Sequence, residues 1–167
     1  MTGDMIDLQN SLLGFADHSV QALTVAEVAL IPREAIIKLA FDRPSIGIAL
    51  WKDTLVDGSI FREWIANVGR RDARTRLAHL LCEFALGWRR RARESLRELP
   101  MTQEHLGDCT GLTSVHINRT LRGLERDELI SRSSRSVTIE DWKSLAQAGD
   151  FQSGYLHLGD AQLTTTQ

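Results

Sequence analysis

The longest regular pattern of apolar residues in the chain lies between residues 44 and 70. Apolar side chains recur there at every third or fourth position, which predicts one long helix that packs along a narrow seam. The seam consists of Trp51, Leu55, Gly58, Phe61, Ile65 and Val68. Packing inside the chain would also account for the pattern. Little chain is left to cover such a seam, however, so a homodimer interface is the favoured interpretation.

The segment before this helix has an alternating pattern. Residues 19–23 and 26–31 alternate imperfectly between apolar and polar positions, which predicts two short β segments with a turn at residues 24–25. Pro32 ends the second segment, and a short helix is expected to follow to about residue 40, because proline is tolerated in the first turn of a helix.

A further helix is predicted after a break at residues 69–72. Asp72 is suited to cap its start, because an aspartate side chain accepts hydrogen bonds from the first backbone N–H groups of a helix. The apolar positions of this helix are Leu77, Leu80, Leu81, Phe84 and Ala85. A polar linker from residue 94 to residue 100 is expected to follow it.

Residues 102–126 predict two short helices joined by a tight turn. Thr102 and Thr113 are suitable N-cap residues. Gly111 lies just past the first helix, where a residue in the left-handed conformation turns the chain sharply. Two short helices joined in this way form a helix-turn-helix unit.

The apolar residues of these two helices indicate which faces point inward. In the first helix, Leu106 and Cys109 are expected to share one face. In the second helix, either Val115 or Ile117 is expected to face inward. Leu121 and Leu124 lie on the same inward face of the second helix.

Polar residues near the start of the second helix suit base recognition. This half of the second helix enters the major groove in helix-turn-helix proteins. Arginine pairs with guanine O6 and N7, and asparagine pairs with an adenine edge. The predicted base-reading residues are Ser114, His116, Asn118 and Arg119. The predicted phosphate contacts are Thr102, Thr113, Arg122, Arg126, Arg132 and Arg135.

A β hairpin is predicted directly after these helices, with a turn at residues 133–134. A hairpin in this position is a wing, and Arg132 and Arg135 near its tip suit contacts with the DNA backbone. The pattern alone would also fit any two-helix unit that is followed by a hairpin.

The overall composition neither favours nor excludes a nucleic-acid partner. The 167 residues include 20 Lys and Arg against 22 Asp and Glu, so binding must come from the local placement of arginines. Hydrophobic residues make up 43% of the chain, enough for a packed core. No run approaches the roughly 20 apolar residues of a membrane span, and no signal peptide is recognisable. A soluble cytoplasmic protein without a membrane partner is expected.

The sequence offers little to catalysis. Its five histidines are scattered without metal-ligand spacing, and His79 is interpreted as a satisfied core or interface residue. Two isolated cysteines, Cys82 and Cys109, form no disulfide framework or zinc site, and both are expected to be buried thiols. Neither a Gly-rich phosphate loop nor a nucleophile elbow is present. The predicted protein is not an enzyme and has no metal or cofactor.

Several stretches together resemble the Crp/Fnr family of regulators. GLTSVHINRTLRGLERDELI is similar to that family's recognition helix and wing entry, with Gly111, Leu112, Val115, Asn118, Arg119, Leu121 and Leu124 in register. DARTRLAHLLCEF resembles the first helix of its DNA-binding domain, with Asp72 at the hinge. EDWKSLAQAGDFQSGYL resembles the C-terminal extension of one branch. The resemblance implies a homodimer that binds a symmetric operator and receives a signal from an N-terminal β-roll.

The sequence departs from the family pattern in several respects. It starts where the middle of the β-roll would lie, so the first half of the sensor domain is expected to be absent. The phosphate-binding arginine of cyclic-nucleotide members has no counterpart near residues 16–18, and the cysteines of the oxygen-sensing branch are missing. Val115 replaces a common acidic base-reading residue, which predicts a different half-site.

These observations predict an α+β protein with three parts. A partial β-roll, a cyclic-nucleotide-binding-like remnant, occupies residues 1–43; a long dimerisation helix occupies residues 44–70; a winged helix-turn-helix domain with a C-terminal extension occupies residues 71–167. The predicted function is transcription regulation by a homodimer on a palindromic operator in double-stranded DNA, with RNA polymerase as a candidate further partner. The alternative is a truncated regulator that dimerises or binds a partner protein without productive operator binding, because an incomplete sheet leaves an unpaired edge.

Overall fold

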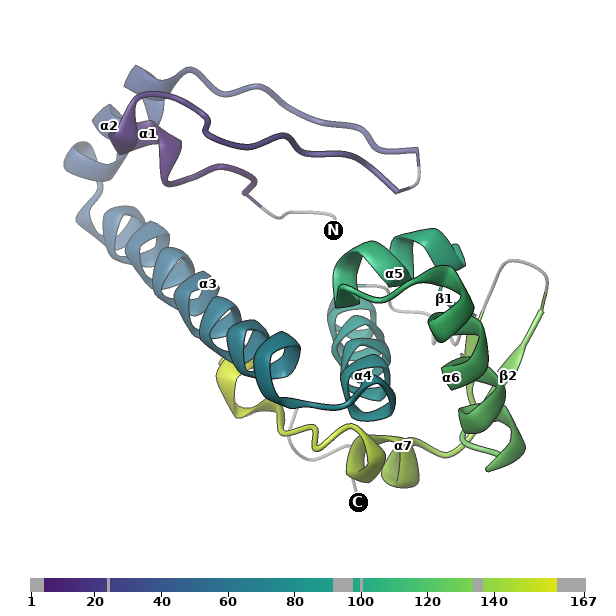
Figure 1. Cartoon of the computed structure of the whole chain (residues 1–167). Helices are drawn as coiled ribbons and strands as arrows, with labels where there is room; N and C mark the ends of the chain where they lie inside the picture. Colours follow the sequence, from purple (N-terminus) through teal and green to yellow (C-terminus); the bar gives the residue numbers. More distant parts are fainter. Residues whose placement is uncertain (1–4, 24, 92–97, 100, 134–136, 159–167) are drawn as a thin grey trace. The chain divides into compact units, whose positions relative to one another are not determined.

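The computed structural model describes residues 5–23, 25–91, 98–99, 101–133 and 137–158 (Figure 1). Residues 2–61 and residues 62–167 form two compact units, and each is described by itself. Helix α3 (Pro44–Arg70) contributes residues to both units and covers the range in which the apolar seam predicts a helix.

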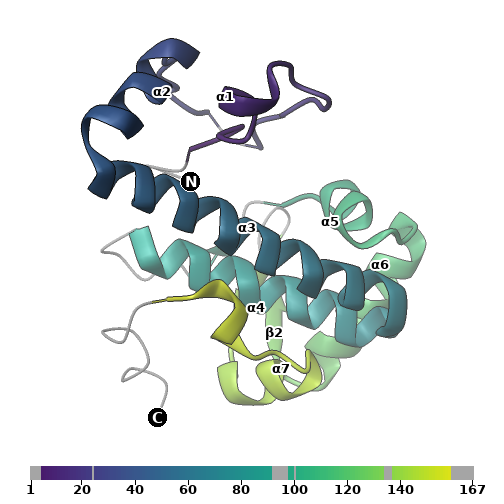
Figure 2. The same ribbon diagram turned by 90° about the vertical axis from the view of Figure 1, so that its left-hand side faces the viewer.

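The unit of residues 62–167 is built around helix α4 (Ala73–Arg91). The further elements are β1 (Glu98–Leu99), α5 (Gln103–Thr110), α6 (Ser114–Arg126), β2 (Ile130–Arg132), β3 (Val137–Ile139), α7 (Trp142–Ala148) and the 3-10 helix η1 (Ser153–Leu156). In Figure 2, α7 and η1 lie along α4, while α5 and α6 follow one another at its other side. The hydrophobic core of this unit therefore draws on elements from its whole length.

Side chains from α4, α5, α6, α7 and β2 fill this core. Leu77, Leu80 and Leu81 of α4 are fully buried, as the apolar spacing predicts. They pack in one cluster with Leu106, Ile117, Leu121, Leu124, Ile130 and Leu145. Full burial of a leucine side chain contributes about 1.5–3 kcal/mol, so this cluster holds α5 and α6 firmly on α4.

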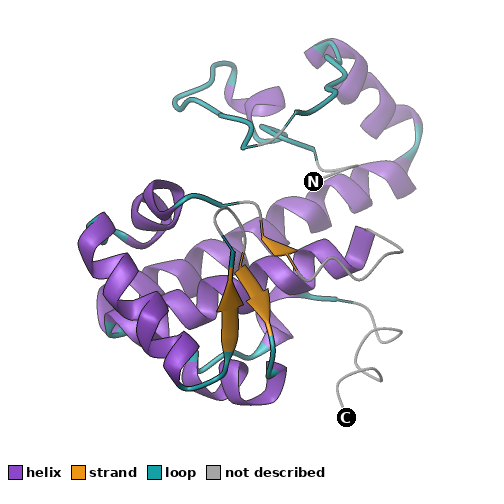
Figure 3. Cartoon of the chain, turned by 90° about the vertical axis from the view of Figure 1, so that its right-hand side faces the viewer, coloured by secondary structure: helices purple, strands orange, loops and turns teal. Residues whose placement is uncertain are grey.

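A three-stranded antiparallel sheet in the order β1-β3-β2 closes the unit (Figure 3). Strands β2 and β3 form the predicted hairpin, with Ile130 opposite Ile139 and Arg132 opposite Val137. The short strand β1 pairs with β3 through Glu98 and Leu99. This strand lies in the stretch for which the sequence predicts only a polar linker, because two residues are too few to show an alternating pattern.

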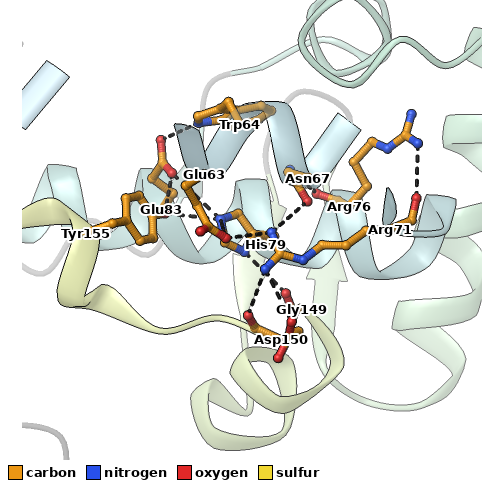
Figure 4. Close-up of polar contacts among 10 residues, drawn as sticks. All are labelled: Glu63, Trp64, Asn67, Arg71, Arg76, His79, Glu83, Gly149, Asp150 and Tyr155. Atoms are coloured by element: carbon orange, nitrogen blue, oxygen red, sulfur yellow. Dashed lines mark hydrogen bonds and ion pairs between the residues drawn. The ribbon is translucent and has the colours of Figure 1, made fainter. Parts of the chain in front are cut away.

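A polar cluster joins the end of α3, α4 and the C-terminal segment (Figure 4). His79 is fully buried, and its Nδ1 lies 3.2 Å from the Gly149 carbonyl oxygen. Its Nε2 lies 3.1 Å from the hydroxyl of Tyr155, which also donates to Glu83. Burial lowers the pKa of His79, and the charge of Arg71 acts in the same direction. These contacts bear out the interpretation of His79 as a satisfied core residue.

Arg71 extends this cluster between α3 and the C-terminal segment. Its guanidinium lies 2.7 Å from Glu63 and 3.2 Å from Asp150, and it also donates to Asn67. Trp64 donates its ring N–H to Glu83 over 3.0 Å. The end of the long helix is thereby connected to α4 by paired polar groups rather than by apolar contacts alone.

Gly149 allows the C-terminal segment to approach α4 closely. A Cβ at this position would lie 2.7 Å from the backbone nitrogen of His79 and 2.9 Å from the carbonyl carbon of Ala78. Gly149→Ala is therefore expected to lower the free energy of unfolding by about 1–3 kcal/mol, the usual cost of overpacking. Chemical denaturation of the full chain measures this loss. Gly154→Ala is the matched control, since a Cβ there meets nothing within 4 Å; an equal loss in both variants would contradict the packing argument.

The two cysteines lie in different environments. Cys82 is buried, and burial raises the pKa of its thiol to about 12. Cys109 is exposed on α5, so the expectation that both thiols are buried is wrong for this residue. Helix α5 is only eight residues long, and its buried face is already occupied by Leu106, Gly107 and Thr110.

In the unit of residues 2–61, the predicted β segments are not formed. Its described elements are α1 (Asn10–Leu13), α2 (Arg33–Asp42) and the first part of α3. Residues 19–23 and 26–31 are drawn without strands in Figure 1, and Val28 and Leu30 in them are exposed. The physical reason is that a strand needs a paired neighbour and a covered apolar face, and the imperfect alternation supplies neither. The predicted helix at residue 33 is present and extends to Asp42.

Candidate functional site

Helices α5 and α6 and the turn between them form the predicted helix-turn-helix geometry. Thr102 caps α5, because its side-chain oxygen accepts a hydrogen bond from the backbone N–H of His105 over 3.1 Å, and the His105 ring contacts the Thr102 N–H in return. Gly111 has φ of 65°, the left-handed conformation that the sequence predicts at this turn. Thr113 caps α6 by accepting from the N–H of His116 over 3.3 Å.

Arg76 of α4 fixes the end of α5. Its guanidinium donates to the Thr110 carbonyl oxygen over 2.7 Å and to the Arg71 carbonyl oxygen over 3.0 Å. The last carbonyl groups of a helix lack partners within that helix, so this arginine satisfies one of them and holds the turn. Arg76 was not among the predicted functional residues, because an arginine inside a helix pattern usually indicates an exposed face.

Helix α6 is sharply divided into a buried and an exposed face. Ile117 is 0% exposed, whereas Val115 is 81% exposed. Of the two alternatives left open by the sequence, Ile117 is therefore the residue that faces inward with Leu121 and Leu124. The exposed face carries Val115, Arg119, Arg122 and Arg126, which all lie on one stripe because they are separated by four, three and four positions.

The four predicted base-reading residues lie together at the start of α6. Ser114 and Arg119 are exposed, while His116 and Asn118 are half-buried. A guanidinium nitrogen of Arg119 lies 3.2 Å from the His116 ring nitrogen Nε2. Asn118 donates to the side chain of Gln103 on α5 over 3.2 Å. Gln103 is thus a polar neighbour of this surface that sequence reasoning missed, because its contact depends on how the two helices meet.

The predicted phosphate-contacting arginines differ in their surroundings. Arg122 and Arg126 are exposed on α6. Arg132 on β2 lies against Glu125, with its Nη2 at 2.7 Å and its Nε at 3.0 Å from one carboxylate oxygen. This hydrogen bond lowers the pKa of Glu125. Arg135 lies outside the described residues. A phosphate contact by Arg132 would therefore require this pair to open.

Asp72, the predicted hinge residue, lies between α3 and α4 and caps α4. Its Oδ1 accepts from the backbone N–H of Thr75 over 2.9 Å, and this hydrogen bond lowers the pKa of the Asp72 carboxyl. The predicted role of Asp72 as an N-cap is confirmed. Its role as a hinge in signal transmission stays a prediction.

The predicted dimer seam on α3 is largely exposed in the single chain. Trp51, Leu55, Phe61, Ile65 and Val68 are all exposed, and Ile65 is 73% exposed. Gly58 is half-buried. An apolar stripe of this length on an uncovered helix face is unusual for a monomer. This face is consequently available for a partner.

Comparison with known proteins supports the helix-turn-helix geometry. Residues 75–148 match the Crp-like helix-turn-helix domain. The transcriptional activator protein FnrL of Cereibacter sphaeroides is 32% identical over an alignment of 149 positions that covers 83% of this chain and 59% of that protein. The nitrogen fixation regulation protein FixK of Azorhizobium caulinodans is 27% identical over 76% of this chain and 52% of that protein.

Solved structures show the same fold at lower sequence identity. FixK2 from Bradyrhizobium japonicum has a TM-score of 0.58 at 21% identity, covering 71% of this chain and 59% of that one. A crp/fnr-family regulator from Eubacterium rectale has a TM-score of 0.54 at 22% identity, covering 73% of this chain and 54% of that one.

The match over residues 75–148, with α5, the Gly111 turn and α6 inside it, defines a helix-turn-helix protein. The chain therefore carries a Crp-like helix-turn-helix domain and is similar to regulators of the Crp/Fnr family. It spans between roughly half and three fifths of the length of the curated relatives given above. FnrL is named as a transcriptional activator and FixK as a regulation protein of nitrogen fixation, and neither is named as an enzyme.

No described helix is both long and apolar enough to cross a membrane. In the part of the chain that the structure describes, no group of three His, Cys, Asp or Glu side chains is placed to hold a metal ion.

Proposed function

We propose that the chain is a sequence-specific DNA-binding transcription regulator that acts as a homodimer on a palindromic operator. The observation that carries this proposal is helix α6. Its apolar face is locked into the core, and Arg119, Arg122 and Arg126 line up on its exposed face. A helix whose buried face is packed firmly against the core and whose exposed face is basic suits insertion into the major groove.

The start of α6 would read the bases. Arg119 offers two parallel N–H donors to guanine O6 and N7, and Asn118 offers a donor and an acceptor to an adenine edge. Each must first leave its present partner, His116 for Arg119 and Gln103 for Asn118. Ser114 at the helix start would reach a base or a phosphate.

The C-terminal half of α6 and the hairpin would hold the DNA backbone. Arg122 and Arg126 continue the exposed stripe, and their guanidinium groups suit phosphate oxygens. The β2–β3 hairpin follows α6 directly and would act as the wing. Thr102 and Thr113 are exposed at the N-termini of α5 and α6, where backbone N–H groups also attract phosphate.

The exposed apolar stripe of α3 would form the dimer interface. A two-fold axis along this helix pairs each stripe with its own copy, as in other isologous dimers. Two copies of α6 would then enter successive major grooves roughly 34–36 Å apart, so the half-sites would lie one helical turn apart. Contact with RNA polymerase would be a further step and is part of the same proposal.

A second function is favoured by the unit of residues 2–61. Phe15, Leu30 and Phe41 in it are exposed, and Leu30 is 94% exposed. Apolar side chains of this size on the surface suit association with a partner. The second candidate is therefore a regulator that dimerises or binds a partner protein without productive operator binding.

Selection of bound duplexes from a random DNA pool, using the full chain, discriminates between the two functions. The first function predicts enrichment of one sequence, here named the selected duplex. Its affinity should fall steeply with salt, because each neutralised phosphate releases counterions. A folded protein that enriches no sequence would contradict the first function and support the second.

A further inference from the structure

Helix α6 carries one apolar residue, Val115, on its exposed face. Its other large apolar residues, Ile117, Leu121 and Leu124, are at most 2% exposed, whereas Val115 is 81% exposed. Valine is also a weak helix former, so neither packing nor helix propensity explains it at this position. Val115 therefore presents an apolar side chain on the face of α6 that points away from the core.

Val115 lies at the head of the basic stripe. Arg119, Arg122 and Arg126 follow it on the same face of α6, at four, seven and eleven positions further on. Ser114 and His116 lie to either side of this stripe. If the stripe faces DNA, Val115 as the second residue of α6 is the stripe's deepest point in the major groove, since the N-terminal half of the recognition helix enters the groove.

The apolar feature of the major groove is the C5-methyl group of thymine. Guanine and adenine present hydrogen-bond donors and acceptors at their major-groove edges, and cytosine carries only a hydrogen at C5 where thymine carries the methyl group. A valine side chain is branched at Cβ and stiff, so it offers a fixed apolar surface of methyl groups without donors or acceptors. Its chemistry matches the thymine methyl and no other base edge.

We propose that Val115 is a specificity-determining residue that reads thymine through its 5-methyl group; this inference rests on the proposed DNA-binding function. Four residues of helix advance about 6 Å, close to two base-pair steps of about 3.4 Å. The thymine should therefore lie within about two base pairs of the guanine that Arg119 reads. Each half-site would then contain a polar contact from Arg119 to guanine and, within about two base pairs, an apolar contact from Val115 to thymine.

The test replaces each thymine of the selected duplex in turn with 2′-deoxyuridine, which lacks only the methyl group. Removing a methyl from an apolar contact is expected to weaken binding of the parent chain about fourfold at one thymine per half-site. In Val115→Ala the loss at that position should shrink to less than about twofold. Losses at all other thymines should stay the same in both proteins. Circular dichroism confirms the fold, and an exposed position makes unfolding of this variant unexpected.

The possible results separate the inference from the function on which it rests. A methyl-dependent thymine that is equally important to the parent chain and to Val115→Ala would overturn the role of Val115. A selected half-site without thymine, or with no methyl dependence at any thymine, would overturn it as well, while sequence-specific binding would stand. A folded chain that selects no duplex would overturn the proposed function itself. Val115→Thr, which replaces one of the two methyl groups with a hydroxyl of similar size, should retain about half of the methyl preference or more.

Discussion

Arg119→Ala is expected to weaken binding to the selected duplex by about 1–3 kcal/mol, roughly five- to 150-fold. The exposed guanidinium of Arg119 lies on the stripe of α6 that faces away from the core. Its loss removes two hydrogen bonds to one base, and the same base position should become degenerate in a new selection. Fluorescence anisotropy titrations at one fixed salt concentration measure the affinity.

Three further variants show whether this effect belongs to base reading. Arg119→Lys keeps the charge but loses the bidentate donor geometry of the guanidinium. It should therefore weaken binding to the selected duplex and leave binding to random DNA unchanged. Arg122→Ala should weaken binding to all duplexes by a similar factor. It should also reduce the slope of log affinity against log salt concentration by about one. Lys143 on α7 lies outside this surface, so Lys143→Ala should change neither the affinity for the selected duplex nor the affinity for random DNA. Equal losses for Arg119→Ala on selected and random duplexes would assign Arg119 to the phosphates.

Ile65→Asp is expected to dissociate the proposed dimer. Ile65 is exposed in the single chain, so the substitution leaves the monomer fold intact, but in the seam it would take one carboxylate from each chain out of water. Burying an unpaired charge costs several kcal/mol, so the dimer dissociation constant should rise by about a hundredfold or more. Sedimentation equilibrium measures the mass, and binding to the selected duplex should fall together with it.

Ala49→Asp is the control for this substitution. Ala49 is exposed on the same helix but lies on the side away from the apolar stripe. Ala49→Asp therefore introduces the same aspartate side chain into α3 but outside the apolar seam. A parent chain that sediments as a monomer, or a dimer that tolerates Ile65→Asp, would contradict the assignment of this face.

The C-terminal unit could be predicted well because its local signals agree with one another. Thr102, Thr113 and Asp72 are capping residues that cap in the structure, and Gly111 has the left-handed conformation that its place after α5 requires. Helical spacing correctly identified the buried leucines of α4 and α6. Such signals depend on residues a few positions apart, which is the range that sequence reasoning covers.

Features that depend on contacts between distant segments were not predicted. The pairing of His79 with Tyr155 joins residues 76 positions apart, and β1 is defined only by its partner β3. The choice between Val115 and Ile117 was left open, because both fit an inward position on spacing alone. The predicted strands of residues 19–31 failed for the same reason, since alternation indicates a strand only where another strand is available to pair with it.

The spacing and symmetry of the half-sites in the selected duplexes test the central claim most directly. If two copies of α6 related by the α3 seam read the DNA, the winning sequences should be inverted repeats with centres about 10–10.5 base pairs apart. An unpaired single half-site, or direct repeats without fixed spacing, would contradict a dimeric regulator built on this helix.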